Sequence, residues 1–258
     1  MDFTECVPKK LQQFFSKHPK AALAFSGGTD SAYLLWAGVQ CGCDIKPYFI
    51  KTAFQPEFEL MDAARLTEES DIPLTIVELD ILSDKTIASN PSDRCYYCKT
   101  NLFTALKQRA CTAGYTTIID GTNASDDVDD RPGMKAIREL GVLSPLRLSG
   151  ITKEQVRAFS KAAGLFTALK PSYACLATRI PSGASITAKD LTKIERSEES
   201  LRQLGYSDFR IRLFHGCARI QLKQSDFSQA ISGYNEITAT IGDDFEGVFL
   251  DLTPRSTD

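Results

Sequence analysis

The chain has 258 residues, 43% of them hydrophobic, which is enough to build one large or two modest cores. A net charge of −3 and the lack of a long basic run argue against a nucleic-acid partner, because phosphate contacts need clustered lysine and arginine. No apolar run reaches the roughly 20 residues of a membrane-spanning helix, and residues 1–20 lack the apolar core of a signal peptide. We therefore expect a cytoplasmic protein with no membrane partner.

Strands and helices are expected to alternate through the first 170 residues. In chain order the expected elements are a helix within 1–20, a strand at 22–25, a helix from residue 30, a strand at 45–52, a helix at 57–70, a strand at 74–79, a helix at 95–110, a strand at 117–120, a helix at 134–140 and a helix that begins at a capping box, Thr152 to Gln155. This alternation predicts an α/β fold with a doubly wound parallel sheet. Ligands of such sheets bind beyond the carboxyl ends of the strands.

The pattern changes after Pro171, where prolines bracket a rigid loop that runs to residue 183. The elements expected beyond it are a helix at 187–204, strands at 209–214 and 218–222 around a His215-Gly216 turn, a helix at 227–241 and a strand at 247–252. We therefore expect a first domain at 1–183 and a smaller α+β domain at 184–258.

The strand at 22–25 runs into a Ser-Gly-Gly-Thr-Asp-Ser turn. Adjacent Gly27 and Gly28 let backbone N–H groups point into one concavity at a helix N-terminus, which suits phosphate. Ser26 and Ser31 add hydroxyl donors, and Asp30 suits a magnesium ion that bridges phosphates. The alternative is an ordinary strand–helix turn with an N-cap.

This turn lacks the Gly-Lys-Ser/Thr of the Walker pattern. It resembles the PP-loop of the ATP pyrophosphatase superfamily, whose members cleave ATP between the α and β phosphates and adenylate an acyl oxygen. Such a resemblance leaves the second substrate open, since amidating and sulfur-inserting enzymes both use this loop.

Three of the eight cysteines stand in settings that suggest chemistry. Cys95 and Cys98 lie three apart at an expected helix start and so share one face, which makes half a metal site or a redox pair. A zinc ribbon would need a second such pair or two histidines, and neither accompanies them. Cys175 lies in the proline-bracketed loop near Arg179, where it is a candidate nucleophile or ligand. Together the three cysteines are able to ligate three irons of a four-iron cluster and leave one iron open, whereas two buried cysteines remain the alternative for Cys95 and Cys98.

The remaining five cysteines have no comparable setting, and we expect packing or surface roles for them. They are Cys6, Cys41, Cys43, Cys111 and Cys217.

Several segments together resemble the ATP-dependent sulfur transferase family (LarE) that builds the nickel-pincer nucleotide of lactate racemase. The matching segments are 26–31, 94–99, 120–123, 131–133, 144–146 and 171–181. The resemblance implies a substrate, pyridinium-3,5-biscarboxylic acid mononucleotide, whose carboxylates are adenylated by ATP with Mg²⁺ and then converted to thiocarboxylates as AMP leaves. Tyr173 departs from the tryptophan that the family often has.

The family uses two sulfur chemistries, and the cysteines distinguish them. In some members the cysteine at position 175 loses its sulfur and becomes dehydroalanine. Others carry the additional Cys-x-x-Cys and a [4Fe-4S] cluster whose free iron holds a sulfide. Because this chain has Cys95, Cys98 and Cys175, it resembles the cluster type, which implies a separate sulfide donor. The family also tends to form rings of subunits, so a homo-oligomer is expected.

The resemblance also assigns roles to residues outside the glycine turn. Gly121 and Thr122 are expected to line the nucleotide, and Arg179 to grip the substrate or the acyl phosphate. Arg210 and Arg212 alternate onto one strand face.

These two arginines are expected to bind the substrate phosphate, with Glu198 as the acidic residue near that site. The alternative for both arginines is a solvated strand face. An aspartate run at 126–130 is expected to be a solvated loop.

Three other functions remain open at the level of sequence. A PP-loop tRNA thiolase would need a basic channel, which the net charge does not offer. An amidating enzyme would not need Cys95, Cys98 or Cys175. A non-catalytic ATP-binding regulator would release no AMP or pyrophosphate.

Overall fold

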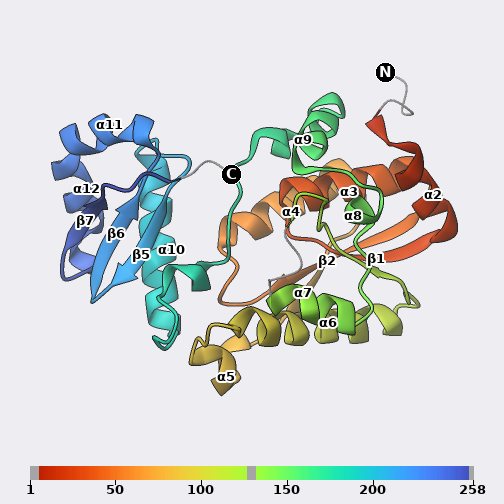
Figure 1. Ribbon diagram of the computed structural model, residues 1–258, viewed down its shortest axis with the longest axis horizontal. Helices are drawn as coiled ribbons and strands as arrows, with labels where there is room; N and C mark the ends of the chain where they lie inside the picture. Colours follow the sequence, from red (N-terminus) through yellow and green to blue (C-terminus); the bar gives the residue numbers. More distant parts are fainter. Residues whose placement is uncertain (1–5, 127–131, 256–258) are drawn as a thin grey trace. The chain divides into compact units, whose positions relative to one another are not determined.

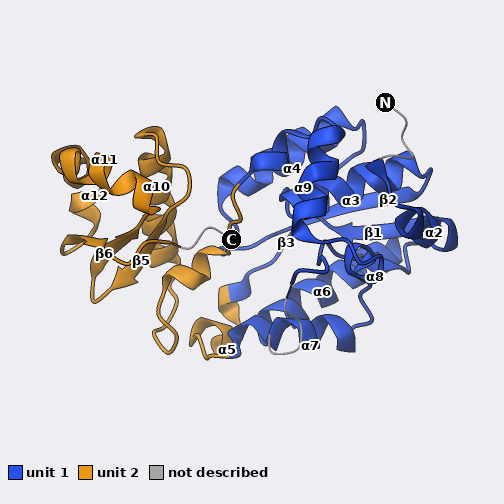
Figure 2. Ribbon diagram, turned by 45° about the horizontal axis from the view of Figure 1, so that its top comes forward, with its two compact units in different colours: residues 1–81, 93–170 blue, residues 82–92, 171–258 orange. Residues whose placement is uncertain are grey.

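The computed structural model describes residues 6–126 and 132–255. Its chain forms two compact units (Figure 2): the first comprises Met1–Ile81 and Asp93–Lys170, and the second Leu82–Ser92 and Pro171–Asp258. The second unit therefore begins at the proline where the sequence pattern changes and also takes in a short earlier segment. The domain boundary at residue 183 stays a prediction.

The first unit contains a four-stranded, wholly parallel sheet in the order β3-β2-β1-β4. Its strands are β1 (Lys20–Ala24), β2 (Asp44–Lys51), β3 (Thr75–Glu78) and β4 (Ile118–Ile119). The strand order reverses between β1 and β4, and this is the place where doubly wound sheets bind their ligands.

Both faces of this sheet are covered by helices (Figure 1). Along β1, Ala21 and Leu23 pack into one hydrophobic cluster, while Ala22 packs into another on the opposite face. Helices α2, α3, α4 and α9 contribute to the first cluster, and α6 and α7 to the second. Their bounds are α2 (Lys9–Lys17), α3 (Thr29–Gln40), α4 (Glu57–Glu69), α6 (Arg94–Thr112), α7 (Pro132–Glu139) and α9 (Lys153–Ala162). The predicted doubly wound α/β architecture is thus confirmed.

Two features of the first unit refine the expected elements. The capping box at the start of α9 is confirmed, because the Thr152 side chain accepts from Gln155 N and the Gln155 side chain accepts from Thr152 N. A four-residue helix that was not expected, α8 (Pro145–Leu148), begins with proline at its first position, which suits a helix start.

The second unit contains a three-stranded mixed sheet in the order β5-β6-β7. The strands are β5 (Arg210–Phe214), β6 (Cys217–Gln221) and β7 (Val248–Asp251). His215 and Gly216 both have positive φ, 47° and 77°, as the expected two-residue hairpin turn requires. Helix α10 (Ala188–Gln203) packs on the face that carries Ile211 and Ile220.

The helix expected at 227–241 is broken, and this prediction is corrected. The chain forms two helices instead, α11 (Phe227–Ser232) and α12 (Tyr234–Ile241). Gly233 lies between them and is both the C-cap of α11 and the N-cap of α12. Glycine favours such a break because it is about 1 kcal/mol less favourable than alanine in the interior of a helix. Both helices bury residues in the cluster beneath the sheet.

The short helix α5 (Lys85–Ala88), also unexpected, belongs to the second unit. No helix among the described residues has the length and apolar character needed to cross a membrane.

Candidate functional site

The turn between β1 and α3 is built around a glycine that no other residue can replace without strain. Gly27 has φ +68°, and a Cβ there would lie 2.8 Å from Glu59 O and 2.9 Å from Ala63 N. Both atoms belong to the backbone of α4, so they cannot move aside cheaply. This glycine therefore lets the turn pass close against α4.

Two serine hydroxyls lie across this turn. Ser26 Oγ and Ser31 Oγ are 3.1 Å apart, and Gly28 N donates to Ser26 Oγ at 3.3 Å. Gly28 is the N-cap of α3 and provides no side chain to the first N–H groups of the helix. Backbone donors, hydroxyls and the positive end of a helix dipole thus meet at one point, which suits an anion.

Asp30, in the first turn of α3, is held by two donors from distant parts of the chain. Its carboxylate forms an ion pair with Lys153, and Asn123 Nδ2 donates to its Oδ1 at 3.2 Å. Mg²⁺ in phosphate-transfer sites commonly takes one or two carboxylates plus the phosphates, so one carboxylate beside a turn that suits an anion fits such a metal. A cluster of three or more His, Cys, Asp or Glu side chains suited to a metal is not found within residues 6–126 and 132–255.

The end of β4 adjoins the start of α3. A Cβ on Gly121 would lie 3.1 Å from Ser31 N and 3.3 Å from Asp30 Cβ. Next to it, Thr122 Oγ1 donates to Asp120 Oδ2 at 2.6 Å. The two predicted nucleotide-lining residues, Gly121 and Thr122, are therefore brought beside the Ser-Gly-Gly turn.

Part of the resemblance falls outside the described residues. The 131–133 segment begins at Arg131, and the aspartate run includes Asp127, Asp129 and Asp130, none of which the structure describes.

Two lysines at this site were missed by sequence reasoning. Lys153 pairs with Asp30, and Lys170 Nζ donates to Gly27 O at 3.3 Å and to Asp62 Oδ2 at 2.5 Å. Lys153 directly follows Thr152, the N-cap of α9, so its place at a helix start was readable from the sequence. Its ion pair with Asp30 could not be predicted, because the two residues lie far apart in the chain.

None of the eight cysteines, all of them among the described residues, is joined in a disulfide. Cys95 is exposed and Cys98 half-buried in the first turns of α6. Cys175 belongs to the second unit, where it precedes the 3₁₀ turn Leu176–Arg179 and its carbonyl accepts from Thr178 N at 3.0 Å. Thiolate donors are what four-iron clusters use, so the chemistry of the three side chains fits such a group.

The Cys41-Gly42-Cys43 pair has a different setting. Burial raises the pKa of the Cys43 thiol to about 11 and also raises that of Cys41. Both are held as neutral thiols at physiological pH, in keeping with the expected packing role.

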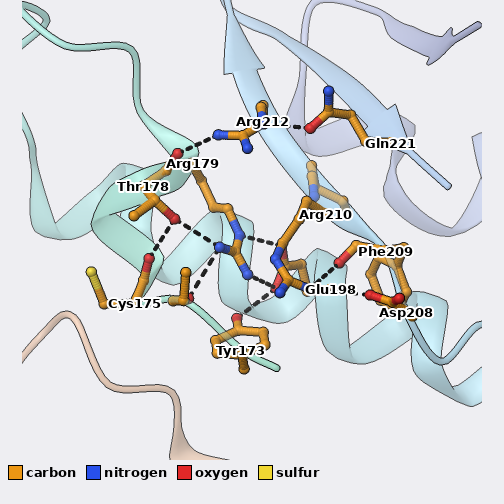
Figure 3. A network of polar contacts seen from close by, with 12 residues as sticks. Tyr173, Cys175, Thr178, Arg179, Glu198, Asp208, Phe209, Arg210, Arg212 and Gln221 are labelled. Carbon is orange, nitrogen blue, oxygen red and sulfur yellow. Dashed lines mark hydrogen bonds and ion pairs between the residues drawn. The ribbon is translucent and has the colours of Figure 1, made fainter. Parts of the chain in front are cut away.

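In the second unit, Glu198 and Arg179 form a buried ion pair (Figure 3). Arg179 Nε lies 2.7 Å from Glu198 Oε1 and both side chains are 1% exposed. Tyr173 Oη donates to Glu198 Oε2 at 2.5 Å, and Ile211 N donates to Oε1 at 3.0 Å. Burial disfavours both charges, but these hydrogen bonds hold the pKa of Glu198 below its ordinary value and that of Arg179 above.

Arg210 and Arg212 differ in how they are engaged. Arg210 is buried and donates to the carbonyls of Phe209 and Ser172. Arg212 donates to Thr178 O at 2.6 Å and to a glutamine on β6. Burial, then the charge of Arg179, lowers the pKa of Arg210 to about 10. A solvated strand face therefore does not describe Arg210.

The first unit is thus a Rossmann-like α/β unit whose β1–α3 turn offers N–H groups, hydroxyls and lysines to an anion. The chain is 36% identical over 226 residues to an uncharacterized protein of Synechocystis sp., covering 86% of this chain and 84% of the relative. An uncharacterized protein of Methanocaldococcus jannaschii is 31% identical over 240 residues, 92% and 90% of the two chains. No established family profile matches the sequence.

A third relative has a named activity. The pyridinium-3,5-bisthiocarboxylic acid mononucleotide synthase of Lactiplantibacillus plantarum is 31% identical over 238 residues, 90% of this chain and 86% of the relative. The chain belongs to the family of this synthase.

Proposed function

We propose that this protein is an ATP-dependent sulfur transferase that converts pyridinium-3,5-biscarboxylic acid mononucleotide to its bisthiocarboxylic acid, a step in nickel-pincer nucleotide synthesis. The observation that carries the proposal is the likeness, along nine-tenths of the chain, to a relative named for that product. The anion-binding turn at the β1–α3 junction supports the ATP-dependent half independently.

In the first half-reaction a substrate carboxylate attacks the α-phosphate of ATP, and pyrophosphate leaves. The N–H groups around Gly27 and Gly28 bind the phosphates, with the hydroxyls of Ser26 and Ser31. Asp30 would hold a Mg²⁺, which would neutralise negative charge on the phosphates.

Gly121, close against α3, leaves room beside the turn for the nucleotide, which Thr122 also lines. Lys153 and Lys170 add the positive charge that a triphosphate requires.

In the second half-reaction sulfur replaces AMP at the activated carboxyl carbon: the C–O bond to AMP breaks and a C–S bond forms. Cys95, Cys98 and Cys175 would hold a [4Fe-4S] cluster, and such a cluster would supply a binding place for sulfide from an external donor. The thiol chemistry of these three residues, none of which is joined in a disulfide, supports this assignment. The same reaction with Cys175 as a sacrificial sulfur donor is the competing route.

The test is anaerobic purification followed by iron and sulfide analysis and a reaction with substrate and Mg-ATP. We expect near-stoichiometric cluster iron, and AMP, pyrophosphate and thiocarboxylate that appear together. Cys95→Ser and Cys98→Ser are each expected to abolish the iron content. Cys111→Ser, a change at an exposed cysteine, is expected to leave the iron content unchanged. AMP formation without thiocarboxylate would contradict sulfur transfer, and activity in an iron-free protein would contradict the cluster.

A further inference from the structure

The last residues of the first unit lie against the β1–α3 turn. They form the 3₁₀ turn Phe166–Leu169 and end at Lys170. Thr29 Oγ1, in the first turn of α3, donates to Thr167 O at 2.8 Å, and both residues are buried. Lys170 Nζ donates to Gly27 O at 3.3 Å. The turn that suits an anion is therefore bonded directly to the segment that ends this unit.

Lys170 places a cation beside the turn. Its side chain is 17% exposed, and its Nζ also donates to Asp62 Oδ2 of α4 at 2.5 Å. An ammonium group has three N–H donors, and two acceptors for it, Gly27 O and Asp62 Oδ2, lie within hydrogen-bond distance among the described residues. A phosphate bound at the turn would add a third acceptor, and a charged one. An occupied turn would therefore hold Lys170 more tightly.

The backbone around Lys170 is stiff. Arg157 of α9 donates to Ala168 O at 2.8 Å and to Lys170 O at 3.0 Å. Pro171 comes next, and a proline restricts the residue before it to extended backbone, as the φ of −61° and ψ of 129° at Lys170 show. The proline ring also fixes the φ of Pro171 itself. A shift of Lys170 is therefore passed along the chain instead of being absorbed by rotation.

The second unit begins at Pro171, and its own contacts begin at once. The next three residues are each hydrogen-bonded within that unit: Ser172 to Arg210, Tyr173 to Glu198 and Ala174 to Arg179. Cys175 follows directly. Pro171 alone thus separates a carbonyl bonded in the first unit, that of Lys170, from one bonded in the second, that of Ser172.

We propose that Lys170 is a positioning residue through which a triphosphate bound at the β1–α3 turn fixes the loop that carries Cys175. A ligand shifts a conformational equilibrium only by its different affinity for the two states, and the third acceptor on Lys170 supplies that difference. This inference rests on the proposed function and deepens it, because it names the residue by which the nucleotide acts on the sulfur-transfer half.

Hydrogen–deuterium exchange of the full-length protein, resolved by peptide, tests the link with and without saturating Mg-ATP. Exchange reports the local opening of a segment. We expect bound Mg-ATP to slow the amides of residues 172–178 at least about fivefold, the lower end of ordinary coupling between sites. The amides of residues 210–221, in the β5–β6 hairpin, are expected to be unaffected. Equilibrium dialysis confirms that each variant is saturated with ATP.

Variants separate coupling through Lys170 from direct shielding by the nucleotide. Lys170→Met is expected to lose the slowing even when saturated with Mg-ATP, because no ammonium joins the phosphates to the segment. Lys153→Met, which removes another lysine of the turn, is expected to keep it at saturation. Lys170→Arg keeps a cation, guards against a folding defect and should keep part of the slowing. Lys161→Met, an exposed change on α9, is expected to behave as the parent does.

Three outcomes would overturn the inference: no binding of Mg-ATP by the parent protein, unchanged exchange at 172–178 when Mg-ATP is bound, or full slowing in Lys170→Met. If exchange is unchanged while the parent forms AMP and thiocarboxylate, the inference fails and the proposed function stands. If exchange slows through Lys170 and no thiocarboxylate forms, the function fails and the inference stands.

Discussion

At the scale of single residues, Glu198 is a buried carboxylate whose two oxygens both accept hydrogen bonds. Four donor atoms reach its two oxygens: two from Arg179, the hydroxyl of Tyr173 and the backbone N–H of Ile211. The rings and charges around it are linked as well, since the guanidinium of Arg179 lies 4.6 Å and that of Arg210 5.0 Å from the Tyr173 ring centre. This carboxylate therefore ties the loop that carries Cys175 to α10 and β5.

Replacing that carboxylate with an amide should be costly. Glu198→Gln leaves Arg179 buried without a counter-charge, and we expect a loss of about 3–5 kcal/mol in the free energy of unfolding. Urea unfolding measures it. Glu199→Gln, one residue along and half exposed, is the control and should stay within about 0.5 kcal/mol of the parent. Equal effects of the two changes would contradict the role given to the buried pair.

The same pair predicts a pH dependence. Because the pKa of Glu198 is lower in the folded than in the unfolded chain, its contribution is fully present above the unfolded value of about 4.3 and is lost as pH falls through the folded value. The stability gap between the parent and Glu198→Gln should stay constant from pH 8 to 5 and narrow only below about pH 4. A gap that closes between pH 7 and 5 would contradict the lowered pKa.

Lys153 makes a comparable prediction at the other site. Its ion pair with Asp30 brings a cation to the turn, so Lys153→Met should weaken ATP binding about tenfold, as the loss of one charge-assisted contact predicts. Lys161→Met, an exposed change on the same helix, is the control. Equilibrium dialysis of ATP with Mg²⁺ measures both, and equal affinities in the two variants would remove Lys153 from the nucleotide site.

At the scale of elements, the β1–α3 turn depends on one glycine for its approach to α4. Gly27→Ala must place a Cβ within 3 Å of the α4 backbone at a positive φ. Gly150 has a similar φ, +75°, but a Cβ added there would meet nothing within 4 Å, so it isolates the conformational cost of about 1 kcal/mol. We expect Gly27→Ala to lower stability by at least about 1–3 kcal/mol more than Gly150→Ala. Thermal unfolding of the two variants measures this difference in stability. Similar losses of stability in both variants would contradict the close packing of Gly27 against α4.

Some helices and strands could be predicted from the sequence, and others could not. Periodicity and caps predicted the parallel strands and α9, because those signals are local. The break at Gly233 was missed, since the apolar spacing continues on both sides of it and hides the glycine. Side-chain partnerships such as Asp30 with Lys153 join positions far apart in the chain, and only the folded sheet brings them together.

Sequence reasoning identified the chemistry of the candidate site better than its geometry. The donor groups of the Ser-Gly-Gly turn could be read from the sequence, and the structure places the Ser26 and Ser31 hydroxyls close together, but binding of an anion there stays a prediction. The partners of Arg210 and Arg212, the carbonyls of Ser172 and Thr178, lie in a distant part of the chain, so alternation along β5 alone does not predict them.

At the scale of the whole molecule, the candidate residues divide between two compact units. The β1–α3 turn, Cys95 and Cys98 belong to the first, and Cys175 with the arginine network belongs to the second. Under the proposed function, adenylation would use residues of the first unit, and sulfur transfer would use cysteines of both units.

The most direct test of this account counts thiocarboxylate groups formed per chain, anaerobically, with Mg-ATP, substrate and excess sulfide, and weighs the peptide that contains Cys175 afterwards. We predict several thiocarboxylates per chain and a Cys175 peptide of unchanged mass. At most one per chain, with that peptide lighter by the mass of H₂S, would contradict the account.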